Sequence, residues 1–133
     1  MKWYCHLLCA ILLLALISTA VPLTIGFLML FLIGAIAPDV IERSLNMRHR
    51  GRCFHEVGTG VVLASLGFAV MPICLEAFGL GCIHHVLLDC TTRRGAYIFG
   101  KHVKGNLKAN RVFDNVLAII LHALLLALFT LAS

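Results

Sequence analysis

The first third of the chain is a long uncharged segment. Residues 7–37 carry no charged side chain, and Pro22 lies near their middle. Proline removes a backbone hydrogen-bond donor and disfavours helical angles at the residue before it, so we predict a break there. The segment then holds two helices, at about 7–20 and 23–37. At a rise of 1.5 Å per residue, each helix is about 20–23 Å long, which is short for a bilayer.

The rest of the chain alternates polar and apolar segments. A polar stretch precedes residue 57, Gly79 and Gly81 predict a turn, and a basic segment precedes residue 112. The helices predicted between these boundaries are at about 57–76, 80–92 and 112–132. The apolar runs are unbroken rather than alternating, which argues against a β-barrel. We therefore predict one all-α domain over residues 1–133, a polytopic transmembrane bundle of four to five helical segments.

Composition supports a membrane protein. Of the 133 residues, 61% are hydrophobic and 13% are charged, and the mean hydropathy is +0.99. Soluble domains are typically about 45–50% apolar and 25% charged, so a soluble domain is excluded. Six cysteines are present, nearly all of them in or beside apolar runs where a thiol acts as a small hydrophobic group, so no disulfide framework is expected.

Basic residues occur in only three places along the chain. They are Lys2, four arginines between residues 43 and 52, and six Lys and Arg residues between 93 and 111. If residues 7–37 form a helical hairpin, all three places lie on one membrane face, and the positive-inside rule makes that face cytoplasmic. We therefore expect a multi-pass inner-membrane protein with its N-terminus inside. A single first span would instead put the two basic loops opposite the N-terminus. The net charge of +5 is explained by topology, so nucleic-acid binding is not expected.

A signal peptide is a competing interpretation of the N-terminal segment. Lys2, the apolar core at 7–17 and the Ser18-Thr19-Ala20 triplet resemble a cleavable leader. Cleavage would remove His6 and invert the orientation of the remaining helices.

Two ionisable residues fall inside a predicted membrane helix. His85 and Asp89 are spaced i, i+4 and share one helical face, as two ligands of one metal ion would. The same spacing also suits a buried hydrogen-bonded pair, and both interpretations stay open. His84 points about 100° away from His85 and is expected to pack rather than to bind metal.

Further histidine and carboxylate side chains fall at the same predicted face. They are His6, Asp39, His49, His55 and Glu56. Imidazole and carboxylate together suit a borderline divalent ion, so we predict a divalent metal site, with zinc as the first choice and manganese or iron as alternatives. A solvated loop residue or a lipid headgroup contact remains the alternative role for His49.

Three sequence motifs resemble the YdjM-type family of inner-membrane metal-dependent hydrolases. They are Gly34 to Asp39 (GAIAPD), His49-Arg50-Gly51 followed by a second histidine, and Gly81 to Gly95 (GCIHHVLLDCTTRRG). His6-Leu7-Leu8 also matches the family's N-terminal His-Leu-Leu. The motifs occur in the family's order and approximate spacing, over residues 6–100.

The resemblance implies a ligand set and also shows departures. Through a more distant similarity of the family to zinc-dependent phospholipase C, it implies a metal held by Asp39, His55, His85 and Asp89, with His49 and His6 nearby. The family's second Asp and the His after it fall at Ile41 and Glu42, so one carboxylate is absent.

The function expected from these features is hydrolysis at the cytoplasmic membrane face. A metal-activated water would attack a lipid or lipid-linked phosphoester, with Glu56 or Glu42 taking the proton. The predicted anion-binding residues are Arg48, Arg50 and Arg52. The expected partner is membrane lipid, and a homo-oligomer stays open. Alternatives are a non-catalytic metal-binding or accessory membrane protein and a structural or transport helix bundle.

Overall fold

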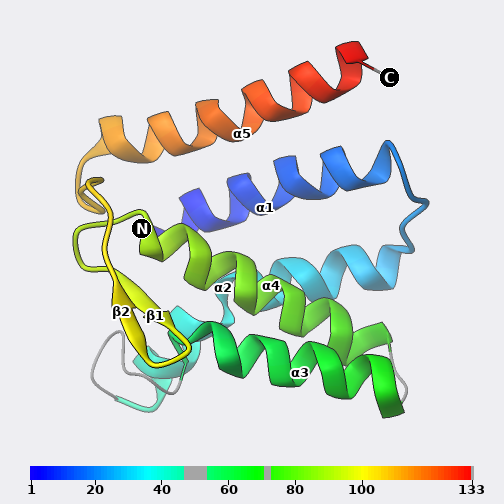
Figure 1. Cartoon of the computed structure of the whole chain (residues 1–133), viewed down its shortest axis with the longest axis horizontal. Helices are drawn as coiled ribbons and strands as arrows, with labels where there is room; N and C mark the ends of the chain where they lie inside the picture. The colour runs from blue at the N-terminus through cyan, green and yellow to red at the C-terminus, as the bar shows by residue number, and fades with distance from the viewer. Residues whose placement is uncertain (47–53, 71–72, 133) are drawn as a thin grey trace.

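The computed structural model describes residues 1–46, 54–70 and 73–132. These residues form five helices and one two-stranded hairpin. In chain order they are α1 (Trp3–Ser18), α2 (Ile25–Ser44), α3 (Val57–Val70), α4 (Ile73–Cys90), β1 (Ala96–Ile98), β2 (Lys101–Val103) and α5 (Val112–Ala132). Each helix runs antiparallel to the one before it (Figure 1). The all-α class is confirmed, with a small hairpin added.

Helix α4 lies at the centre of the arrangement. It packs against α2 on one side and α3 on the other, while α1 joins α2 to α5. Figure 1 shows α5 as the outermost helix, beyond α1. Large apolar side chains are exposed along the whole length of α5, from Val112 to Leu131.

Glycines allow α4 to approach both neighbours closely. A Cβ built on Gly81 would lie 2.2 Å from the carbonyl oxygen of Phe31 in α2, and one on Gly79 would lie 2.4 Å from the backbone nitrogen of Ala64 in α3. Small residues at such positions let helix backbones pack together. The turn predicted at Gly79 and Gly81 is therefore wrong, because both glycines serve helix packing inside α4. The predicted bounds 57–76 and 80–92 are corrected accordingly to Val57–Val70 and Ile73–Cys90.

The boundaries of the first two helices follow the prolines only in part. The break predicted at Pro22 is confirmed, and the Thr24 side chain caps α2 by accepting a hydrogen bond from the Phe27 amide at 3.2 Å. The predicted end at residue 37 is wrong, since α2 continues through Pro38 to Ser44. Asp39 therefore lies within a helix rather than after one.

The basic segment before α5 contains a hairpin that was not predicted. Its strands are joined by Phe99 and Gly100, which both have positive φ angles, 44° and 80°. Two-residue turns of this kind favour Asn or Asp followed by Gly. Because Phe99 stands at the first turn position, the sequence lacks the usual pattern that predicts a hairpin.

The two ends of the bundle differ in charge. The start of α1, the end of α2 and the connection from α4 to α5 lie at one end, and the C-terminus lies at the other (Figure 1). All eight basic residues that the structure describes belong to segments that begin or finish at the first end. Two of the described helices, Ile25–Ser44 and Val112–Leu131, are long and apolar enough to cross a membrane.

Candidate metal centre

Four of the predicted ligands converge from three parts of the chain. Asp39 comes from α2, His55 from the segment just before α3, and His85 and Asp89 from successive turns of α4. One nitrogen or oxygen from each residue lies within 4.8 Å of all the others. The side chains of His55, His85 and Asp89 are fully buried, whereas that of Asp39 is 20% exposed.

Five of the distances among these atoms, 3.3–3.8 Å, are close to the edge lengths of a tetrahedral metal site. His55 Nε2 lies 3.3 Å from Asp39 Oδ1 and 3.5 Å from Asp89 Oδ2. His85 Nε2 lies 3.8 Å and 3.7 Å from the same two oxygens, and the two Nε2 atoms are 3.3 Å apart. A tetrahedral zinc site with bonds of about 2.0–2.1 Å has edges of about 3.3–3.4 Å. The set therefore fits a small divalent ion.

The other ring nitrogen of each histidine is held by an acceptor. His85 Nδ1 lies 2.8 Å from the carbonyl oxygen of Ala35, which can only accept, so this nitrogen carries the proton. His55 Nδ1 lies 2.9 Å from Glu42 Oε1, a carboxylate oxygen. In the neutral rings both Nε2 atoms then turn bare lone pairs toward the centre. Metal-binding histidines are commonly oriented by such contacts.

Backbone contacts fix where His55 lies. The Tyr97 amide of β1 donates to the carbonyl oxygen of His55 at 2.9 Å, and Glu56 bridges to the same strand. Glu56 Oε1 accepts from the Gly100 amide at 2.8 Å. The β1–β2 hairpin therefore holds the segment that carries His55. The turn of the hairpin also donates a hydrogen bond to the Glu56 carboxylate.

The surroundings of His55 favour a positive charge. Burial alone would lower the pKa of His55, but the hydrogen bond with Asp39 and the charges of Glu42 and Asp89 outweigh it and raise that pKa above its ordinary value. The same carboxylates would stabilise a bound cation.

His6 and the amino group of Met1 lie on the outer side of Asp89. The His6 ring stacks on His85 with centroids 3.9 Å apart, and its Nε2 lies 3.5 Å from Asp89 Oδ1. The Met1 amino group contacts the same oxygen. Since Asp89 Oδ2 faces the other ligands, His6 lies beside the set of four rather than in it.

A cavity of about 760 Å³ adjoins the centre. Its lining residues are Met1, Lys2, Trp3, Asp39, Val40, Glu42, Arg43 and Ser44. Asp39, the partly exposed ligand, thus connects the buried centre with a space large enough for a small substrate. Lys2 and Arg43 supply positive charge there. From the sequence pattern, both residues were expected only to mark the cytoplasmic end of a helix.

The remaining predicted residues have separate outcomes. His49, Arg48, Arg50 and Arg52 lie outside the described residues. His84 is 8% exposed and packs near Phe31 and His122, away from the four ligands, as expected. Ile41, where the family has its second Asp, lines a small apolar cavity with Pro38, Phe54 and Phe78.

No family model matches this chain, and no curated protein or solved structure is significantly similar to it. The resemblance to the YdjM-type family stays a prediction from the sequence motifs.

Proposed function

We propose that this protein is a membrane-bound, metal-dependent hydrolase that acts at the cytoplasmic membrane face on a lipid or lipid-linked phosphoester. The observation that carries the proposal is the buried set of Asp39, His55, His85 and Asp89, with the outer nitrogen of each histidine already held by an acceptor. The motifs shared with the YdjM-type family add support from the sequence.

Several features support a multi-pass location. Exposed apolar side chains cover α5, and others lie on α1 and α2, such as Ile11 and Ile33. Such surfaces are unfavourable in water but suit lipid. The antiparallel helices bring the basic segments to one end, and the positive-inside rule makes that end cytoplasmic. The metal centre then lies near the level of lipid headgroups.

The four residues would hold a divalent ion, zinc in the first place, with manganese or iron as alternatives. A bound ion of this kind lowers the pKa of water toward neutrality and so supplies a nucleophile at ordinary pH. Of the two candidate bases, Glu42 lines the cavity beside Asp39 and Glu56 does not, so Glu42 is better placed to accept a proton from a water molecule there. Lys2 and Arg43 would hold the phosphate of a substrate in the cavity.

A non-catalytic metal site is the second candidate. Catalytic zinc sites commonly combine three protein ligands with a water molecule, whereas closed sites use four. The set of four protein ligands favours this alternative. The cavity at Asp39 favours the hydrolase, because a substrate could reach the partly exposed ligand from it.

Elemental analysis of detergent-purified protein tests the metal centre. We expect about one metal ion per chain in the wild type and none in the double variant H85A/D89A. His84→Ala is the matched control, because it removes a neighbouring buried histidine that lies outside the ligand set, and it should keep the metal. Negligible metal in the wild type after growth and purification with metal supplied would overturn the proposal.

A hydrolysis assay then separates the two candidates. The metal-loaded protein is incubated with phosphatidic acid, phosphatidylglycerol and a polyprenyl phosphoester, and phosphate or headgroup release is measured. The control is Lys101→Gln, which changes an exposed residue of β2. The hydrolase is supported if turnover falls in Arg43→Gln and stays unchanged in the control. Bound metal without turnover on any of these lipids supports the non-catalytic site.

A further inference from the structure

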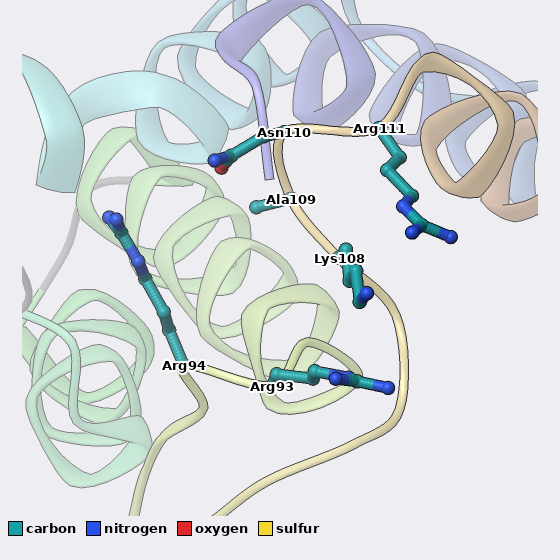
Figure 2. A pocket seen from close by; sticks show the side chains of 6 residues that line it. All are labelled: Arg93, Arg94, Lys108, Ala109, Asn110 and Arg111. Carbon is teal, nitrogen blue, oxygen red and sulfur yellow. The ribbon is translucent and has the colours of Figure 1, made fainter.

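A second, separate pocket lies where α4 leads into α5. It has a volume of about 330 Å³ and is lined by Arg93, Arg94, Lys108, Ala109, Asn110 and Arg111 (Figure 2). None of these residues lines the cavity beside the metal centre. Four of the six lining side chains are cationic, and none is acidic.

The walls of this pocket are held by backbone and side-chain hydrogen bonds. The Arg93 amide donates to the Leu107 carbonyl oxygen at 2.8 Å. This hydrogen bond brings the start of the α4–α5 connection next to its later part. The buried Asn115 side chain donates to the carbonyl oxygens of Ala109 and Arg111 at 3.0 Å and 2.7 Å. The turn between Lys108 and Arg111 is therefore fixed before any ligand binds, which lowers the entropic cost of binding.

The positive charge of the pocket is not neutralised within the described chain. None of the four cationic side chains forms a salt bridge among the described residues, and the Arg93 side chain donates only to the Asn106 carbonyl oxygen. The nearby Asp114 carboxylate accepts from the Lys108 backbone amide. Figure 2 shows Arg93, Lys108 and Arg111 extending to the same side, and Arg94 to the other.

Two features beside the pocket indicate the kind of anion. The first turn of α5 begins directly after Arg111, and a helix N-terminus favours negative charge. Val112 and Phe113 follow, with 64% and 73% of their surfaces exposed. A cationic pocket with an exposed apolar surface next to it matches a ligand that has a phosphate and an acyl chain, rather than a small soluble phosphate.

We propose that this pocket binds the headgroup phosphate of an anionic membrane lipid, held by Arg93, Lys108 and Arg111, with the acyl chains along Val112 and Phe113. The site is independent of the metal centre, because it shares no residue with it. It would anchor the start of α5 at the membrane face.

Native mass spectrometry of the protein in neutral detergent tests this site. The probe is phosphatidylglycerol, compared with uncharged phosphatidylcholine and with glycerol 3-phosphate as a soluble phosphate. The pocket variant is R93Q/R111Q. Its matched control is K101Q/K104Q, which removes two charges from the same segment at exposed positions outside the pocket.

We expect the pocket variant to bind phosphatidylglycerol about 30-fold more weakly than the wild type, and the control to bind it as the wild type does. An equal loss in both double variants would overturn the proposal in favour of a general surface-charge effect. Equal binding of phosphatidylcholine would overturn the role of the phosphate. Equally tight, variant-sensitive binding of glycerol 3-phosphate would overturn the lipid as ligand. An unchanged melting temperature of the lipid-free variant confirms that it folds.

Discussion

At the residue scale, Glu42 orients one of the four candidate metal ligands without belonging to that set itself. It accepts from His55 Nδ1, so it selects the tautomer that turns Nε2 toward the other ligands. Removing the acceptor in Glu42→Leu should lower metal affinity by about 10–100-fold, as loss of such outer contacts usually does. Glu42→Gln keeps an acceptor oxygen and should lose much less. Competition with a chelator of known affinity measures both.

Glu76→Leu is the control for this change, because Glu76 lies in the first turn of α4, at the other end of the helix from His85 and Asp89. Equal affinity in Glu42→Leu, Glu42→Gln and wild type would show that His55 is oriented by other contacts.

The sequence could supply only part of this residue-level arrangement. The i, i+4 spacing alone placed His85 and Asp89 on one face of α4. The acceptors of the two Nδ1 atoms depend on tertiary contacts, since Ala35 is fifty positions from His85 and offers only a backbone carbonyl. The Lys2 and Arg43 side chains at the cavity were likewise beyond prediction, because they meet only when α1 packs beside α2.

At the element scale, the close contact of α2 and α4 sets the distance between Asp39 and His85. A Cβ on Gly34 would lie 2.2 Å from the Phe78 carbonyl oxygen, so Gly34→Ala must push the helices apart. We expect a loss of about 1–3 kcal/mol in stability, as for other overpacked cores, together with weaker metal binding. Thermal unfolding and metal content report the two effects.

Gly26→Ala provides the matched control on the same helix. A Cβ there meets no atom within 4 Å, so the change should be neutral or slightly stabilising through helix propensity. If Gly34→Ala kept wild-type stability and metal content, the spacing of α2 and α4 would not determine the centre.

Element types were easier to predict than element boundaries. Long apolar runs indicated helices correctly, and Pro22 marked a true break. Gly79 and Gly81 misled because a single sequence does not distinguish a glycine needed for a turn from one needed for helix contact. Pro72, immediately before α4, was the better boundary signal. Pro38 misled in the opposite direction, because α2 tolerates it.

At the scale of the whole molecule, charge and helix direction together predict the orientation. The described basic residues lie in three separate parts of the sequence, and they come to one end of the bundle because two helices separate each part from the next (Figure 1). That grouping follows from the predicted hairpin before Ser44. A single first helix would have sent Lys2 to the opposite end from the other basic segments.

Thiol labelling in vesicles of defined orientation tests this arrangement across a membrane. Thr19→Cys lies in the exposed α1–α2 connection and Lys101→Cys in exposed β2, at opposite ends of the bundle. Each is placed in a background with Cys53 and Cys74 replaced by serine, since Cys5, Cys9, Cys82 and Cys90 are buried. In right-side-out vesicles an impermeant maleimide should label Thr19→Cys at once, and Lys101→Cys only after permeabilisation, because the positive-inside rule keeps the basic end in the cytoplasm. The reverse order would contradict the predicted orientation, and labelling of both from outside would contradict a bundle that crosses the bilayer.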